Sequence, residues 1–375
     1  MTAINPVSDS PLEGYWGVDG SQHVIFIGTD DHIHQLDVAP GATGWVDNDL
    51  TALTGPPPYT IPESVPRSGL GGFCGADNSQ QVNYVGGDYC VHMLYNEPSG
   101  HGWVDGAIGP ASLNTPMPGY YGSDGSKWVF YVAGGPAGTG IHEFYTAPGA
   151  VKPGWTDNDL TASTGGVQPH GDTIDAYRSS DGSRHVNFIG ADGHVHELSI
   201  GTGETHWANN DLTAPTGAVG PLDGTALNSY AGAGGSRHVN FIGVDGHIHQ
   251  LFVAGGETGW VDGDLTKLAE AVAPASGTVL DGYWGIDGSQ HVSFIGVDGH
   301  VHQVHVAGGE TGWVDGDLTK LAEAVAPASG TALDAYGGAD GSQHVSFIGV
   351  DGHVHQVHVA VGGTGWSDAD LTTLA

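Results

Sequence analysis

The stretch that decides the fold is residues 280–319, LDGYWGIDGSQHVSFIGVDGHVHQVHVAGGETGWVDGDLT. The pairs Asp287-Gly288, Asp298-Gly299 and Gly308-Gly309 divide it into four short runs of β-branched and aromatic residues. Asp-Gly and Gly-Gly between such runs favour tight hairpin turns, because glycine accepts the positive φ that these turns require. The stretch therefore predicts a four-stranded antiparallel meander.

The same pattern occurs seven times, and each copy ends in a tryptophan followed by an acidic, Leu-Thr-like stretch. These tryptophans are Trp45, Trp103, Trp155, Trp207, Trp260, Trp313 and Trp366. A nearly fixed period of about 53 residues indicates an array of similar units, not one irregular core. The units cover approximately residues 12–51, 70–109, 118–161, 174–213, 227–266, 280–319 and 333–372.

Seven meanders in series predict an all-β chain folded as one seven-bladed β-propeller domain over residues 1–375. A radial array leaves only short, protected strand edges. The second run of most units is almost continuously apolar, as in Val345–Ile348, which suits a sheet covered on both faces. The two ends of the chain are then expected to meet. An open β-solenoid is the alternative, although solenoid coils are usually shorter and rarely meanders.

The charge of the chain excludes two classes of partner. The sequence has 8 basic and 42 acidic residues and a formal net charge of −34. Such a field repels phosphate backbones and anionic lipids, so we expect neither nucleic acid nor membrane insertion. The first residues lack the basic and apolar regions of a signal peptide, which predicts cytoplasmic synthesis and any release by a non-classical route. Cys74 and Cys90 lie outside the repeat pattern and are predicted to be free thiols.

Several polar and aromatic positions recur and are predicted to converge on one rim of each sheet, because the first and third turns of a meander lie at the same end. A histidine opens the second run, a serine precedes it by two residues, and a long polar residue such as Gln22 or Arg237 stands between them. Glu204, Glu257 and Glu310 lead toward the tryptophan from the third turn. Hydroxyls of a sugar need paired polar groups, and its C–H face packs on an aromatic ring.

The predicted carbohydrate-binding residues are therefore repeated sets of tryptophan, histidine, serine and first-run tyrosine. They are Trp45, Trp155, Trp207, Trp260, Trp313, Trp366, His23, His185, His238, His291, His344, Ser21, Ser183, Ser236, Ser289, Ser342, Tyr15, Tyr177, Tyr230, Tyr283 and Tyr336. A purely structural role is the competing interpretation, with the tryptophan wedged between sheets and the following aspartates accepting backbone N–H bonds.

A His-x-His pair opens the third run of five units, for example His300 and His302. Residues i and i+2 of a strand share a face, so each pair could bind Zn²⁺ or Ni²⁺. The second histidine also occurs at His92 and His142, where the first is replaced, which favours a structural bond to a carbonyl of the next blade. We expect no cofactor and no functional metal site.

No nucleophile motif, phosphate loop or isolated carboxylate pair stands out, so we expect no enzyme activity. The seven-fold pattern HV-x-F-I-G-x-D-G-H-x-H … W-x-x-x-D-L-T resembles the bacterial seven-bladed propeller lectins of the Photorhabdus lectin type. The resemblance covers nearly the whole chain. It implies a homo-oligomeric protein that binds L-fucose and related or O-methylated sugars on glycans and glycoconjugates, at sites repeated between blades.

Units two and three depart from this pattern at Gln81, Ala107 and Trp128, which weakens the expectation of sites there. A multivalent, non-catalytic lectin is the predicted function. A propeller scaffold for protein–protein interaction is the main alternative and would show one non-repeating surface patch. A glycan hydrolase or lyase is a further alternative and would need carboxylates at unique positions facing the channel.

Overall fold

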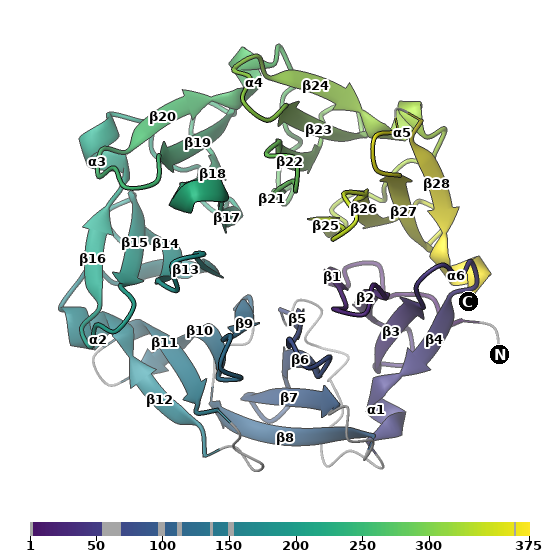
Figure 1. Ribbon diagram of the computed structural model, residues 1–375, viewed down its shortest axis with the longest axis horizontal. Helices are drawn as coiled ribbons and strands as arrows, with labels where there is room; N and C mark the ends of the chain where they lie inside the picture. The colour runs from purple at the N-terminus through teal and green to yellow at the C-terminus, as the bar shows by residue number, and fades with distance from the viewer. Residues whose placement is uncertain are drawn as a thin grey trace.

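The computed structural model describes residues 3–54, 69–96, 102–110, 115–135, 138–148, 154–363 and 365–375. Within these residues, seven four-stranded antiparallel sheets stand as blades around a central axis (Figure 1). This confirms the predicted all-β, seven-bladed propeller. In the described part of the chain, no helix is long and apolar enough to span a lipid bilayer.

Each blade consists of four successive strands, the first beside the axis and the fourth at the periphery (Figure 1). Blades 1 to 3 contain β1 (Glu13–Trp16), β2 (Gln22–Ile27), β3 (Ile33–Val38), β4 (Val46–Asp49); β5 (Gly71–Cys74), β6 (Gln80–Val85), β7 (Cys90–Asn96), β8 (Trp103–Pro110); and β9 (Gly119–Tyr121), β10 (Lys127–Gly135), β11 (Gly138–Thr146), β12 (Thr156–Asp159). Blades 4 and 5 contain β13 (Pro169–Arg178), β14 (Arg184–Gly190), β15 (Val195–Ile200), β16 (Ala208–Asp211); and β17 (Leu227–Ala231), β18 (Arg237–Ile242), β19 (Ile248–Val253), β20 (Val261–Asp264). Blades 6 and 7 contain β21 (Asp281–Trp284), β22 (Gln290–Ile295), β23 (Val301–Val306), β24 (Val314–Asp317); and β25 (Leu333–Gly337), β26 (Gln343–Ile348), β27 (Val354–Val359), β28 (Ser367–Asp370).

The Asp-Leu-Thr stretch after the fourth strand forms a corner that the sequence only partly predicted. In blade 1, Asp49 Oδ1 accepts the backbone N–H of Ala52 and caps a one-turn helix, which was not expected from the sequence. Leu50 is fully buried, and Thr51 Oγ1 accepts the N–H of Ile33. The helices that follow a fourth strand are α1 (Leu50–Leu53), α2 (Leu160–Thr164), α3 (Thr213–Thr216), α4 (Leu265–Leu268), α5 (Leu318–Leu321) and α6 (Leu371–Leu374).

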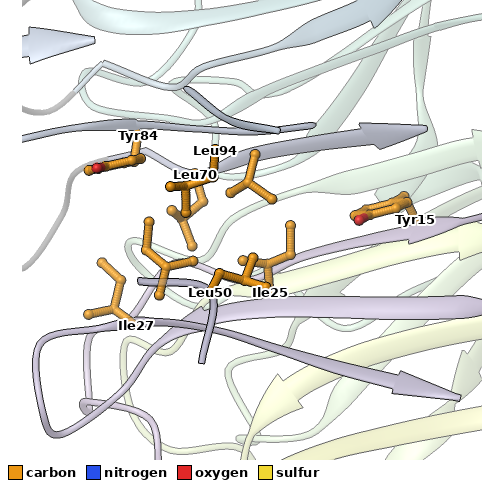
Figure 2. Close-up of a cluster of buried hydrophobic side chains, with 9 residues drawn as sticks. Tyr15, Ile25, Ile27, Leu50, Leu70, Tyr84 and Leu94 are labelled. Carbon is orange, nitrogen blue, oxygen red and sulfur yellow. The ribbon is translucent and has the colours of Figure 1, made fainter. Parts of the chain in front are cut away.

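The hydrophobic core is divided among the seams, the interfaces between adjacent blades. Figure 2 shows the seam between blades 1 and 2, where Ile25, Ile27 and Leu50 of one blade face Tyr84 and Leu94 of the next. Leu50 and Ile25 have no solvent-exposed surface. Because every blade is covered on both faces, its strands do not alternate between apolar and polar residues as the strands of a sheet with one solvent-exposed face do. The apolar second strand predicted from the sequence follows from this burial.

The ring closes without strand exchange, because blade 1 uses only N-terminal strands and blade 7 only C-terminal ones. Phe26 packs with Ile348 and Leu371 in one cluster, which also includes residues near both ends of the chain. The Trp16 ring lies 5.6 Å from His344 across this seam, as Trp284 lies 5.5 Å from His238 across the seam between blades 5 and 6. The closing seam therefore resembles an internal one, and the predicted meeting of the termini is confirmed (Figure 1).

Two blades depart from the regular pattern. β13 begins at Pro169 and carries an irregularity before Ile174, so it is longer than the short first strand predicted. β8 continues to Pro110, and residues 111–114 beyond it are not described. Cys74 in β5 and Cys90 in β7 are free thiols on non-adjacent strands, as predicted.

Carboxyl groups from the first strands line a central cavity of about 660 Å³. Glu13, Asp175, Asp281 and Asp334 contribute to it, and two of them accept hydrogen bonds from the following blade. Asp175 Oδ2 accepts the hydroxyl of Ser229 at 2.9 Å, and Asp281 Oδ2 accepts the N–H of Ala335 at 2.6 Å. Burial, followed by the neighbouring Glu13 carboxylate, raises the pKa of Asp334 well above its ordinary value. The ring interior therefore favours protonated carboxyls.

We expect Asp334→Asn to stabilise the protein at neutral pH, because folding must either bury the Asp334 carboxylate or protonate it, and asparagine avoids both costs. The gain should be about 1–3 kcal/mol, the usual cost of such a group. Because the pKa of Asp334 is raised in the folded state, the wild type gains stability as the pH falls. The advantage of Asp334→Asn therefore shrinks as the pH approaches 3.8, the ordinary pKa of an aspartate. Urea unfolding of wild type and Asp334→Asn between pH 7 and pH 4 tests this prediction, with the exposed Asp223→Asn as the control. A difference in unfolding free energy that does not change with pH would contradict it.

Candidate functional site

A chain of hydrogen bonds runs from the first turn of blade 1 into the interior of the blade. In blade 1, Ser21 Oγ donates to Asp19 Oδ1 at 2.6 Å. A hydroxyl has one proton, so Ser21 Oγ accepts from His23 Nε2, 2.7 Å away. Gln35 Nε2 then donates to His23 Nδ1 at 2.8 Å, and Gln35 Oε1 accepts the Tyr15 hydroxyl at 3.1 Å. We call this Asp–Ser–His–Gln–Tyr series the relay.

The relay explains the recurrence of the predicted serines, histidines and tyrosines. The serine–histidine bond recurs at 2.8, 3.0, 2.7 and 2.7 Å in blades 4 to 7. All five histidines are at most 4 % exposed, and the five tyrosines at most 9 %. Their side chains therefore support the turn from inside the blade, and Ser183 and Ser236 are the most accessible of the serines. A direct contact of these residues with sugar stays a prediction.

Sequence reasoning missed the fourth member of the relay. The glutamine or glutamate always follows the histidine by twelve residues, as in His23 and Gln35 or His185 and Glu197. The spacing of twelve residues can be read from the sequence. Only the pairing of β2 with β3 shows that it brings the two side chains together. Burial of the relay lowers the pKa of His23, His238, His291 and His344 to about 4.

The repeated tryptophans lie in the seams and do not form an open aromatic surface. Each packs against the core cluster that its own blade shares with the preceding blade. Trp45 is 9 % exposed, whereas the other six are half-buried. The wedge between sheets proposed as the structural interpretation is therefore what the geometry shows. Contact with a ligand is limited to the exposed edge of each ring.

A polar pair crosses the seams, and its two members come from different blades. Arg237 Nη1 of blade 5 donates to Glu197 Oε2 of blade 4 at 2.7 Å, and Arg184 pairs with Glu143 of blade 3 in the same way. In the seam between blades 1 and 2, Gln35 Nε2 instead donates to Gln80 Oε1 at 3.3 Å. We call these contacts seam pairs.

One seam opens into a cleft that contains several of the predicted residues. The cleft between blades 4 and 5 has a volume of about 260 Å³. Ser183 and His185 line it from blade 4, and Arg237 and Glu257 line it from blade 5. Trp260 does not line the cleft, but its ring lies 5.0 Å from the Arg237 guanidinium carbon. The cleft thus joins turns of two neighbouring blades, where the sequence predicted convergence within one unit, and arginine lies between the cleft and the indole.

Blade 4 also aligns a serine, a histidine and a carboxylate. Ser183 Oγ lies 2.8 Å from His185 Nε2, and His185 Nδ1 lies 3.1 Å from Glu197 Oε1. This order resembles a hydrolase nucleophile, base and orienting acid. However, Ser183 Oγ donates to Asp181 Oδ1 at 2.6 Å, so its proton faces away from the histidine. The arrangement favours a structural relay over an activated nucleophile.

The second histidine of each His-x-His pair binds carboxylates of its own blade, not a carbonyl of the next blade as predicted. In blade 1, His34 Nδ1 lies 2.8 Å from Asp47 Oδ1, and His34 Nε2 lies 3.2 Å from Asp30 Oδ1. His92 makes the equivalent contacts to Asp105 and Asp88 in blade 2, at 3.2 and 3.1 Å. The structural role that the sequence favoured holds, with a different partner.

Solved structures share this fold, although no protein-family model and no curated protein matches the sequence. The BP39L lectin from Burkholderia pseudomallei superposes with a TM-score of 0.71 at 16 % identity, over 97 % of this chain and 98 % of that one. The fucose-specific lectin from Aleuria aurantia gives a TM-score of 0.58 at 14 % identity, over 98 % and 96 %. SapL1 lectin, solved in complex with α-methyl fucoside, gives 0.55 at 15 % identity, over 84 % and 97 %. At these identities the similarity shows a common fold.

Acid should destabilise the protein through its buried relay histidines, and His291→Gln should remove one share of that effect. The folded pKa of His291 is about 4 against an ordinary 6.5, so the unfolded chain takes up the proton first. Stability from this group is complete above pH 6.5 and is lost toward pH 4, by up to about 3 kcal/mol. Gln81 occupies this position in blade 2, so the fold accepts the substitution.

Chemical unfolding between pH 7 and 4 tests this prediction. His291→Gln should be less stable than wild type at pH 7, and the gap should close as the pH falls. The exposed His170→Gln is the control and should keep the wild-type slope. Parallel slopes for wild type and His291→Gln would show that the relay histidine is not held neutral.

The seam pair between blades 4 and 5 should show strong coupling in a double-mutant cycle. Arg237→Gln leaves Glu197, which has no exposed surface, without its cation and should cost about 2–5 kcal/mol. Adding Glu197→Gln recreates the glutamine pair of blades 1 and 2 and should recover most of the loss. Urea unfolding of the four proteins measures the coupling, and additive losses would refute the pairing.

Proposed function

We propose that the protein is a multivalent lectin without catalytic activity, which binds L-fucose or a related or O-methylated sugar in its seams. The cleft between blades 4 and 5 is the observation that carries this proposal. A volume of about 260 Å³ suits one small polar ligand better than an extended chain. The cleft is built by two blades, so a ligand there contacts both.

The groups that line this cleft match the needs of a sugar ring. Arg237 supplies N–H donors beyond the one that Glu197 accepts, and Glu257 supplies a carboxylate acceptor. Ser183 lies opposite on blade 4. Vicinal hydroxyls act as both donors and acceptors, so a paired cation and carboxylate can bind them together. The Trp260 ring restricts the guanidinium to one orientation before binding.

The structural neighbours support the choice of ligand class. The Aleuria aurantia lectin has been solved with α-methyl-L-fucoside and with Fucα1-6GlcNAc. Together with the seven-fold sequence pattern, these support fucosylated or methylated glycans and glycoconjugates as partners. The same resemblance supports a homo-oligomer.

Repetition of the seam gives the proposed binding its multivalency. Arg184 and Glu204 occupy in blade 4 the places of Arg237 and Glu257 in blade 5, and Gln290 and Glu310 occupy them in blade 6. Single sugar sites are weak, but several on one rigid ring raise avidity by roughly 10²–10⁴-fold when they engage one surface. The expected ligands are therefore dense glycans more than soluble monosaccharides.

Binding should be tested with a glycan array and by calorimetric titration of methyl α-L-fucoside. The double variant Glu197→Gln/Arg237→Gln keeps a seam pair but removes the cation of the cleft, so it should lose at least one site per chain. Exposed Asp223→Asn should bind as wild type does. If the array retains no sugar even at high protein density, the protein is not a lectin. If the double variant keeps the wild-type number of sites, the cleft is not a binding site.

A further inference from the structure

Four metal-ligating side chains meet at the outer corner of blade 6. Asp298 lies in the turn before β23, His300 and His302 lie at the start of that strand, and Asp317 ends β24. One ligating atom of each lies within 4.8 Å of the others. Blades 1 and 7 repeat this quartet around His32 and His353, and blades 4 and 5 bring three of its atoms equally close. We call this set the corner quartet.

The buried histidine of the quartet faces carboxylates with both of its ring nitrogens. His302 is 3 % exposed, and its Nδ1 lies 3.0 Å from Asp315 Oδ2. In blade 4, Asn209 holds the same place with its amide oxygen, 3.1 Å from His196 Nδ1. An amide oxygen only accepts, so Nδ1 carries the proton. His302 Nε2 lies 3.1 Å from Asp298 Oδ2, so the two ring nitrogens face two different carboxylates, one of which belongs to the quartet.

The first histidine of the quartet is not needed to build the corner. Blade 3 has Gly140 in its place, yet Asp159 Oδ1 still accepts the N–H of Ala162 and caps α2. In blade 6 the cap likewise uses Asp317 Oδ1, whereas Oδ2 faces His300 Nδ1 at 2.8 Å. The cap and the histidine contact therefore use different oxygens, so the capped corner can form without His300.

We propose that the corner quartets of blades 1, 6 and 7 bind Zn²⁺ or a similar divalent transition metal, through two imidazole nitrogens and two carboxylate oxygens. A tetrahedral ion with bonds of 2.0–2.1 Å holds its ligands about 3.3 Å apart. Three of the six existing separations, 2.8, 3.1 and 3.9 Å, bracket that value, and all six lie within 4.8 Å.

Access and charge balance suit an exchangeable ion. His300 and Asp298 are 37 % and 42 % exposed, so the ion reaches the site from solvent. Coordination through His300 Nδ1 moves its proton to Nε2, without net change of charge on the ring. Asp315 contacts His302 Nδ1, the ring nitrogen that does not face the ion, and carboxylates commonly orient metal-binding histidines in this way. The ion joins the turn before the third strand to the end of the fourth.

The test is a Zn²⁺ titration of the full chain by calorimetry, with metal content measured after desalting and Co²⁺ absorption as a report of geometry. Wild type should bind at least three ions, show a four-coordinate Co²⁺ spectrum and gain thermal stability with Zn²⁺ but not with Mg²⁺. His32→Ala/His300→Ala/His353→Ala should bind three ions fewer. These histidines are partly exposed, so the variant should fold.

Two further variants separate a built site from adventitious binding. Asp49→Asn/Asp317→Asn/Asp370→Asn keeps the helix caps, because asparagine caps as well as aspartate, but removes one ligand from each quartet. We expect at least a tenfold loss of affinity there, whereas exposed His170→Ala should match wild type. Equal Zn²⁺ affinity in the asparagine variant would mean adventitious binding by the imidazole pair only and would overturn the proposal. So would failure of the histidine variant to lose ions.

Discussion

Burial of both faces of every blade is the constraint on which the rest of the structure depends. A single meander of this sequence is apolar on both sides and cannot be stable in water alone, because nothing would cover Phe294 or Val304. Each seam buries the face of one blade against the next, so the ring is stable only when every seam is filled. The closing seam must therefore repeat an internal seam, as the Trp16–His344 contact shows.

This constraint also determines where polar groups can lie. A carboxylate buried in a seam needs a partner there, and Glu197 finds it in the neighbouring blade. In blades 4 and 5, an arginine begins the second strand and pairs with a glutamate of the preceding blade. In blade 2, Gln80 begins the second strand and accepts a hydrogen bond from Gln35 of blade 1. The charges thus match across the seam, not within the sequence unit. Unit 4, which carries both Arg184 and Glu197, would leave a buried charge unpaired if it stood between two units with glutamine at these positions.

The sequence predicted the blade count, the meander and the positions of the turns, because each depends on residues close together in the chain. Asp298-Gly299 identifies its hairpin without tertiary information, and Gly299 adopts φ of +80° there. The seam pairs were not predicted, because Glu197 and Arg237 lie in different units and meet only through the ring. The exposure of the tryptophans was equally hidden, since it depends on the preceding blade.

Because the cleft lies at a seam, the number of equivalent sites depends on pairs of neighbouring units. Each seam is built by two units, so one divergent unit alters the seams on both of its sides. Blade 2 has Met93 where other blades have glutamine or glutamate, and Lys127 of blade 3 lies over the rings of Tyr95 and Tyr121, at 5.5 and 5.2 Å. A thioether cannot replace a carboxylate as an acceptor in a seam pair. Seven blades therefore provide fewer than seven equivalent seams, and the most similar ones join blades 5, 6 and 7, where the units diverge least.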